Sequence, residues 1–362
     1  MTFLSFVLAF VGFALLVILH ELGHFSMAKA VGMRVERFSL FFPPTLARKQ
    51  VGETEYAIGS IPLGGYVKIS GMNPDEDLPP EARDRAYHAQ PVWKRIVVIA
   101  AGPTVNLVLA FVLLFFYFAV IGPYDTGVAK LEKGYPAAGK LQVGDTIVGV
   151  DGRAVDPNSD FSKLIAAHRC PERPPTAGCR AATPVQVTVV HDGRRRSFEL
   201  TPVYDPRIKR TRIGFQYGDL ETRANLSLGE ATDLTLDRYW FITKATLELP
   251  ARLINPEQRK QLSGVVGSYE ATRQTILHQF DDVIGILAII SLSLAIVNLF
   301  PFLPLDGGHI FWAIVEKVRR RPVPLAVMER AGVVGFMLVI LVFLIGLSND
   351  IGRLSGEGFQ VR

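Results

Sequence analysis

Four long apolar runs without a single charged residue constrain the fold of this chain more than any other feature of its sequence. A transmembrane helix needs about 20 such residues to cross ~30 Å of hydrocarbon, and helices buried in soluble proteins rarely stay uncharged for so long. The sequence therefore predicts an α-helical polytopic membrane protein with about four transmembrane helices. The runs cover residues 3–19, 96–122, 283–305 and 331–347.

The first run differs from a secretory signal peptide. No basic residue precedes it, and His20-Glu21 follows it where a small-x-small cleavage site would stand. We expect it to be a retained transmembrane helix.

Basic residues give the chain a net charge of +5, and they occur in the connection between the first two apolar runs and in the one between the last two. The long region 123–282 is also rich in arginine, but long domains translocate largely regardless of charge. The positive-inside rule then places both connections in the cytoplasm and both termini outside. Because these residues form no single long patch, we expect the lipid bilayer and no nucleic acid as a partner.

The chain between the second and third runs is less apolar. Short apolar alternations separated by Gly-Asp and Asp-Gly pairs predict a small β-rich domain, and a generic β module without a binding role would show the same turns. A linker and amphipathic helical region should follow over residues 206–280, with a helix at 240–254 that lies on the membrane. Nearer the N-terminus, residues 55–70 predict a strand, a turn and a strand, in which Gly64-Gly65 permits a close backbone approach.

The two cysteines, Cys170 and Cys179, bracket a proline-rich loop. A disulfide is expected if this domain faces an oxidising compartment, and two unpaired thiols are the alternative.

The sharpest chemical signal is the sequence His20-Glu21-Leu-Gly-His24 at the end of the first run. Residues four apart share one helix face, so the two histidines can bind one Zn²⁺. Glu21 lies beside them and can take a proton from a water molecule. Two interfacial histidines beside a surface glutamate are the plainer interpretation.

Zinc needs a third protein ligand, and Asp306 is the candidate at the end of the third run. The first and third runs cross the membrane in the same direction, so both ends should lie at a similar depth near the cytoplasmic side. Asp-Gly is also a common turn, and His309 is a competing ligand. Asn106 and Asn298 are polar residues within apolar runs, where they can contact substrate, steady a ligand or pack helices together.

Four motifs together resemble the site-2 protease family of intramembrane zinc metalloproteases, in the regulator-of-sigma-E protease branch. They are HELGHF at 20–25, IPLGGYVK at 61–68, AAGPTVN at 100–106 and NLFPFLPLDGGH at 298–309. The resemblance implies one Zn²⁺ per chain with Asp306 as its third ligand. It also implies a membrane-associated β-hairpin, within residues 36–71, that pairs with an unwound substrate. The expected substrate contacts are Gly64, Gly65, Tyr66, Asn106 and Asn298.

Residues 134–155 resemble a PDZ domain of the bacterial protease type. The branch often carries two such domains in tandem, whereas this chain has room for one. The resemblance implies an extracytoplasmic PDZ domain over residues 123–205. It lies between a membrane metalloprotease half at 1–122 and a second membrane half at 281–362.

The implied function is regulated intramembrane proteolysis in the bacterial inner (cytoplasmic) membrane. After an upstream site-1-type protease trims a single-pass membrane protein such as an anti-sigma factor, this enzyme would cut the remaining transmembrane segment. The rival hypothesis is a catalytically silent membrane scaffold that holds partners through its PDZ domain. A metal transporter is disfavoured because only one intramembrane cluster of ionisable residues exists.

Overall fold

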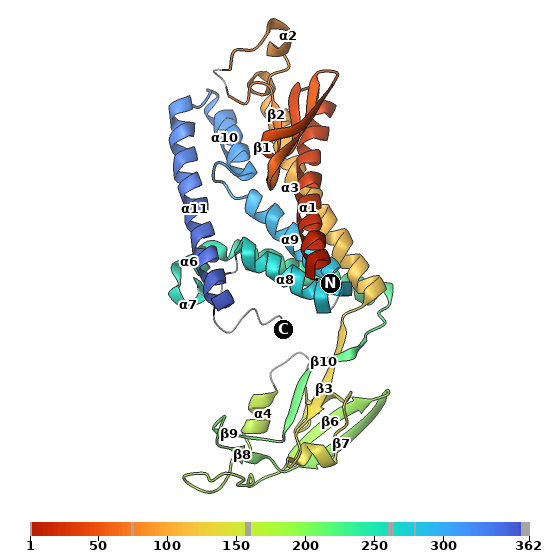
Figure 1. Cartoon of the computed structure of the whole chain (residues 1–362). Coiled ribbons are helices and arrows are strands. Elements are labelled where there is room, and N and C mark those ends of the chain that lie inside the picture. Colours follow the sequence, from red (N-terminus) through yellow and green to blue (C-terminus); the bar gives the residue numbers. More distant parts are fainter. Residues whose placement is uncertain are drawn as a thin grey trace. The chain divides into compact units, whose positions relative to one another are not determined.

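The computed structural model describes residues 2–73, 76–155, 161–259, 262, 264–278 and 280–355. They form two compact units, each of which can be followed in Figure 1. Unit 1 combines Met1–Val120 with Ser227–Arg362, and unit 2 is Ile121–Leu226. The units are described separately.

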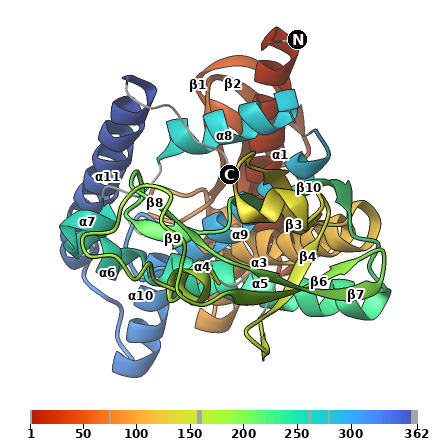
Figure 2. The same ribbon diagram turned by 90° about the horizontal axis from the view of Figure 1, so that it is seen from below.

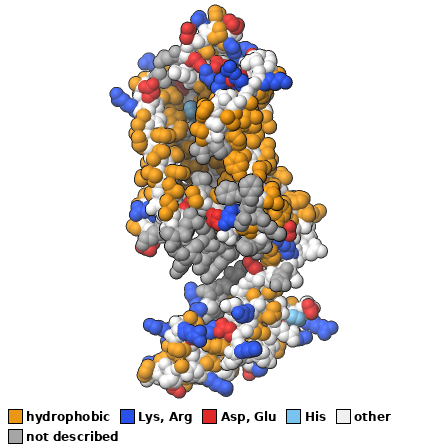
Figure 3. Space-filling view, viewed as in Figure 1, with side chains coloured by type: hydrophobic (Ala, Val, Ile, Leu, Met, Phe, Trp, Pro, Cys, Tyr) orange, Lys and Arg blue, Asp and Glu red, His pale blue; other side chains and the backbone are white. Residues whose placement is uncertain are grey.

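Unit 1 contains four helices that are long and apolar enough to cross a membrane, as the sequence predicts. In Figure 3, hydrophobic side chains cover much of the visible face of these helices, and charged side chains gather at the end that carries the hairpin. The chain is therefore a multi-pass membrane protein. The helices are α1 (Thr2–Ala30), α3 (Val92–Phe116, continued by a π-helical turn, Tyr117–Ile121), α9 (Val283–Asn298) and α11 (Leu325–Ser355).

The sequence predicts that the third span continues to residue 305, but the helix ends earlier. Helix α9 ends at Asn298, and a non-helical loop leads to α10 (Asp306–Arg319). Pro301 and Pro304 lie in this loop, and proline has no amide hydrogen to continue a helix. The two prolines thus keep this segment from being helical, and the resulting loop places Asp306 at the start of α10.

Helix α3 is the centre of unit 1 and packs against α1, α9 and α10. A Cβ atom on Gly23 of α1 would lie 2.7 Å from the carbonyl oxygen of Ala101 on α3. Only glycine permits so close an approach of the two helices. This contact brings the metal-binding motif of α1 against the AAGPTVN motif of α3.

The predicted β-hairpin is a folded sheet of two long strands, β1 (Val35–Val51) and β2 (Thr54–Ile69). Phe38 pairs with Tyr56 on one side and with Val67 on the other, so both halves of β2 flank the start of β1. Residues 65–69 consequently form an edge, with no second strand beside them in the described part of the chain. Figure 1 shows this sheet beside α1.

Four helices follow unit 2 in the sequence and belong to unit 1: α5 (Leu228–Leu247), α6 (Leu249–Ile254), α7 (Pro256–Arg259) and α8 (Val265–His278). Ser227 and Glu230 form a capping box that starts α5. The expected helix at 240–254 is divided between α5 and α6, where Pro250 lies in the first turn of α6. Helix α8 packs against α1, α9 and α11 (Figures 1 and 2).

Unit 2 is a β-rich domain with its own apolar core of fully buried residues such as Ile147, Val187 and Ile213. One sheet has the order β5-β4-β6-β7, and two strand pairs, β10-β3 and β8-β9, complete the unit. The strands are β3 (Tyr124–Leu131), β4 (Thr146–Val150), β5 (Arg153–Ala154), β6 (Val185–His191), β7 (Arg194–Leu200), β8 (Val203–Asp205), β9 (Arg210–Arg212) and β10 (Phe215–Arg223).

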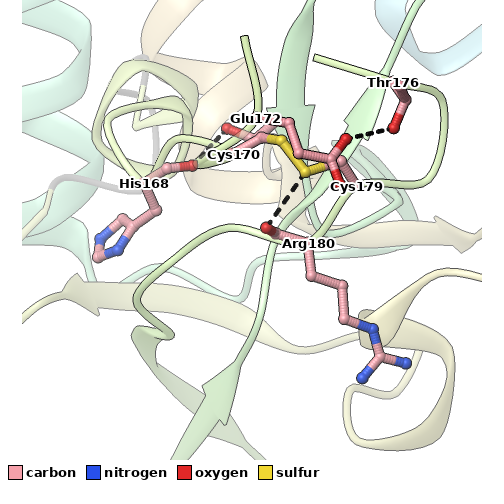
Figure 4. Close-up of a disulfide and its surroundings, with 7 residues drawn as sticks. His168, Cys170, Glu172, Thr176, Cys179 and Arg180 are labelled. Atoms are coloured by element: carbon pink, nitrogen blue, oxygen red, sulfur yellow. Dashed lines mark hydrogen bonds between the residues drawn. A yellow bond between two sulfur atoms is a disulfide. The ribbon is translucent and has the colours of Figure 1, made fainter.

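The expected boundary of this domain at residue 205 is too early. Strand β10 pairs with β3, so residues up to 226 belong to the unit and not to a linker. Short helices complete the secondary structure: α2 (Pro80–Arg83), α4 (Ser162–Ala166) and the 3₁₀ turns Tyr87–Ala89, Pro136–Gly139 and Phe280–Asp282. Cys170 and Cys179 are bonded, which confirms the disulfide and closes the proline-rich loop (Figure 4).

Candidate active site

His20 and His24 lie one turn apart on α1, and both side chains are buried. Their Nε2 atoms are 3.2 Å apart. The i,i+4 spacing that the sequence shows therefore brings two imidazole nitrogens to one point on the helix face.

The ring of His24 is held from behind by α3. Its Nδ1 lies 2.9 Å from the carbonyl oxygen of Val98, which can only accept, so Nδ1 carries the hydrogen and Nε2 keeps a free lone pair. A Cβ on Gly102 would overlap this imidazole ring. The glycine of the AAGPTVN motif thus leaves the space that the His24 ring fills.

Asn106, also on α3, stands behind His20. The side chain of Asn106 is fully buried, and its Nδ2 lies 3.4 Å from Nδ1 of His20. Asn106 Oδ1 is buried without a hydrogen-bond partner among the described residues. Turning the amide by 180° lets this oxygen accept the hydrogen of His20 Nδ1, which leaves Nε2 of His20 free as a ligand.

Asp306 comes to the same point from the first turn of α10. Its Oδ2 lies 3.1 Å from Nε2 of His20 and 3.4 Å from Nε2 of His24. Cβ atoms on Gly307 and Gly308 would collide with the backbone of Leu299 and Phe302 in the preceding loop. The two glycines that follow Asp306 therefore let α10 begin directly on that loop.

The spacing of these three atoms fits a zinc ion. Tetrahedral zinc with bonds of about 2.0–2.2 Å holds neighbouring nitrogen and oxygen ligands about 3.3–3.5 Å apart. Asp306 Oδ2 is buried and has no hydrogen-bond donor among the described residues. Three electron-pair donors that converge on one point in this way can share a cation. Among the described residues, one further group could hold a metal by its side chains, Cys170, Glu172 and Cys179, but its two sulfurs are bonded to each other.

Glu21 borders the same cavity, which has a volume of about 450 Å³ and is also lined by His20, His24 and Asp306. Val67 on β2 lines the cavity together with Glu21. A Cβ on Gly65 would lie 3.1 Å from Cγ of Glu21, so the glycine lets the edge of β2 pass close to the carboxylate. The cavity thus combines three side chains that could hold a metal ion, a carboxylate and a strand edge.

The structure brings most of the predicted site residues to this cavity. Its lining includes Gly64, Gly65, Tyr66 and Asn298, and Asn298 Nδ2 lies 3.5 Å from Nε2 of His20. Asn106 differs, because its buried side chain does not line the cavity. Its position is better suited to orienting the His20 ring than to contacting a substrate. His309 lines the cavity and is not one of the three side chains that could hold a metal ion.

Comparison with known proteins decides the family. The profile of peptidase family M50 matches residues 8–342. The chain belongs to peptidase family M50. It is 32% identical to the zinc metalloprotease Rip1 of Mycobacterium tuberculosis, with 87% of each chain covered. It is 30% identical to a Brucella suis protein named "Putative zinc metalloprotease", with 92% of each covered.

This M50 peptidase is a zinc metalloprotease, and Zn²⁺ is its cofactor. The expected family, enzyme class and cofactor are thereby confirmed.

A pair of residues that the sequence does not reveal links two of the helices that form the site. Arg95 on α3 binds both carboxylate oxygens of Glu316 on α10, at 2.9 and 2.7 Å, and Arg95 is buried. Burial raises the pKa of Tyr87, whose ring packs against Arg95, to about 12. An arginine directly before an apolar run indicates that a buried partner is needed, but the sequence does not identify that partner.

Proposed function

We propose that the protein is an intramembrane endopeptidase in which His20, His24 and Asp306 hold one zinc ion per chain and Glu21 is the general base. It would cleave the transmembrane segment of single-pass membrane proteins. The observation that carries this proposal is the approach of the two Nε2 atoms and Asp306 Oδ2 to within 3.1–3.4 Å of one another beside Glu21. Both histidines lie within a helix that is apolar enough to span a membrane.

The chemistry follows from the side chains around the cavity. His20, His24 and Asp306 would hold the zinc ion, which would supply Lewis-acid chemistry that activates a water molecule and polarises the scissile carbonyl group. Glu21 accepts a proton from the attacking water and passes it to the nitrogen of the departing amine. The new C–O bond replaces the broken C–N bond, and no further reactant is required.

The edge of β2 supports a role in presenting the substrate. A peptide bond in a transmembrane helix is shielded by its own hydrogen bonds, so the segment must be extended before attack. Residues 65–69 offer a free strand edge along the cavity, and an extended peptide can pair with such an edge. Gly64, Gly65 and Tyr66 would contact that peptide, and Asn298 would help to place it.

The wider setting is also a proposal. Unit 2 would be a single PDZ domain outside the bacterial cytoplasmic membrane, and the zinc site would lie near the cytoplasmic side. Basic residues in the connections after α1 and α10 support this orientation. The substrate would be a protein such as an anti-sigma factor that a site-1-type protease has already trimmed.

The decisive experiment compares the wild type with Glu21→Gln on a single-pass test substrate in detergent, with zinc counted in both proteins. We expect Glu21→Gln to keep about one zinc and to lose cleavage, because the amide cannot take a proton. Glu329→Gln removes an exposed carboxylate on α11 and serves as the matched control with wild-type activity. Cleavage by Glu21→Gln at the wild-type rate would rule out the catalytic assignment. A wild type that binds zinc and substrate without cutting any substrate would favour the silent scaffold.

A further inference from the structure

Strand β2 lines three neighbouring cavities, one after another. The catalytic cavity shares Val17, Gly64 and Gly65 with an apolar cavity of about 370 Å³. It shares Tyr66, Val67, Ile69 and Met72 with a third cavity of about 350 Å³. The order of the strand residues thus gives the order of the cavities: the apolar one at 64–65, the catalytic one at 64–69 and the third at 66–69.

The apolar cavity lies between three elements of unit 1. Phe10, Phe13, Ala14 and Val17 of α1 form one wall, Phe41 of β1 forms a second, and Tyr269 of α8 forms a third. No charged side chain lines this cavity in the described part of the chain. Its volume falls in the range of roughly 300–1,000 Å³ that ligand pockets occupy.

The wall formed by α8 is fixed to the rest of unit 1. Asp350, a fully buried residue of α11, accepts hydrogen bonds from the backbone N–H groups of Gly264 and Gly267, at 3.0 and 2.7 Å. The ring of Tyr269 also packs near Phe13 of α1, with 6.3 Å between the ring centroids. These contacts hold the start of α8 in place, so the cavity has a defined shape and can discriminate between side chains.

We infer that this apolar cavity is a specificity subsite for a large apolar side chain of the substrate, on the side of the scissile bond that faces the N-terminal part of α1. The inference rests on the proposed proteolytic function. A peptide extended along β2 from the catalytic cavity reaches Gly64 and Gly65 next, and these two residues are the floor that both cavities share. One side chain of that peptide then enters the apolar cavity.

The chemistry of the lining defines what the subsite accepts. A substrate side chain arrives from lipid, so filling the cavity gains packing contacts rather than removal from water. Leucine, isoleucine, methionine and phenylalanine have the bulk to make these contacts. An ionised side chain would find no partner among the lining residues, so lysine or glutamate at this position should be rejected.

Cross-linking in the inactive Glu21→Gln protein tests the position of the substrate without any need for cleavage. Ala14→Cys is combined with a substrate that carries one cysteine at each position in turn. We expect cross-links at one or two positions, spaced by two residues as in a strand. Leu15→Cys is the matched control, because Leu15 is exposed on α1 outside the cavity. Equal cross-linking along the whole segment, or none, overturns the inference; the second result would mean that lipid fills the cavity.

Filling the cavity tests its selectivity in the active enzyme. For Ala14→Phe we expect kcat/KM for a substrate with leucine at the cross-linked position to fall about 10-fold or more. The same substrate with alanine there should keep its rate, and Leu15→Phe should leave both unchanged. An equal fall for both substrates, or no fall, contradicts the inference. If the wild type cleaves nothing, the proposed function fails, while the pattern of cross-links still decides whether the cavity receives the substrate.

Discussion

At the scale of single residues, the proposed zinc site depends on glycines as much as on its proposed ligands. Gly102 is the clearest case, because the ring of His24 occupies the space where a side chain at position 102 would lie. Metal sites are sensitive to such support, since a ligand displaced by a fraction of an ångström no longer meets the ion.

We predict that Gly102→Ala releases zinc. The new methyl group must push the His24 ring away from Val98 and from the other two ligands. Zinc per chain and zinc affinity, measured by competition with a chelator, should both fall, and proteolysis should fall with them. Gly332→Ala on α11 is the control, because a methyl group there meets no atom within 4 Å. Full zinc occupancy in Gly102→Ala would contradict this account of the glycine.

The residue scale also shows how much of the candidate site the sequence can predict. The spacing along one helix predicts His20, Glu21 and His24, whereas the choice of Asp306 as third ligand rests on the resemblance to the site-2 protease family. The hydrogen bond that orients His24 could not be predicted from the sequence, because its partner Val98 lies 74 residues away. No local pattern records such a contact.

At the scale of helices and strands, the site is built where α1, α3 and α10 meet. Helix α3 holds both histidines from behind, and the Arg95–Glu316 pair fixes α10, whose first residue is Asp306, to α3. The pair therefore acts on the metal site by positioning a helix, not by touching the ion.

We predict that Glu316→Gln weakens zinc binding. Loss of the carboxylate leaves a buried guanidinium without its counter-charge, which costs about 1.5–3 kcal/mol for charged hydrogen bonds. Part of this cost should appear as lower zinc affinity, because α10 is then free to shift Asp306. The double variant Arg95→Met with Glu316→Leu removes both charges and should recover stability. Thermal unfolding of the metal-free protein separates the two effects: a loss of stability with unchanged zinc affinity would mean that the pair is structural only.

A second prediction at this scale concerns the turn between β1 and β2. Ion pairs with Arg85, at 2.7 Å, and with Lys29, at 2.7 Å, lower the pKa of Glu53 to about 2. Because this value is below the ordinary value of 4.5, the pairs stabilise the folded state above pH 4.5 and lose that effect as the pH falls toward 2.

Glu53→Gln should therefore lower the unfolding temperature at pH 7, and the difference from wild type should shrink as the pH approaches 2–3. Glu329→Gln again serves as the control. A difference that stays constant over this pH range would mean that the charge of Glu53 does not stabilise the turn.

The pairing of the strands is the part of the fold that local sequence patterns do not predict. The pairing of β10 with β3 joins residues about 80–100 positions apart, so the sequence-based boundary of unit 2 came too early. The double pairing of Phe38 with Tyr56 and Val67 likewise depends on how the hairpin folds back. The apolar runs, in contrast, are local, and each of the four contains a helix long enough to cross a membrane.

At the scale of the whole molecule, the proposed orientation rests on the four apolar helices and on the basic residues of the connections between them. We predict that a cysteine placed at Leu46, which is 72% exposed in the sheet, reacts with a membrane-impermeant reagent only after the membrane is opened. A cysteine at Arg195 in β7 of unit 2 should react from outside in intact cells. The reverse pattern would invert the proposed topology and place the zinc site near the outer surface.

The free edge of β2 has a consequence for the kind of protein that this enzyme can attack. In hydrocarbon, a backbone group without a hydrogen-bond partner costs several kcal/mol, so a transmembrane helix resists unwinding. The edge at residues 65–69 supplies replacement partners as the helix opens. The rate of cleavage should then follow the local helix propensity of the target, with glycine- or proline-containing segments cut fastest and uninterrupted leucine helices left intact.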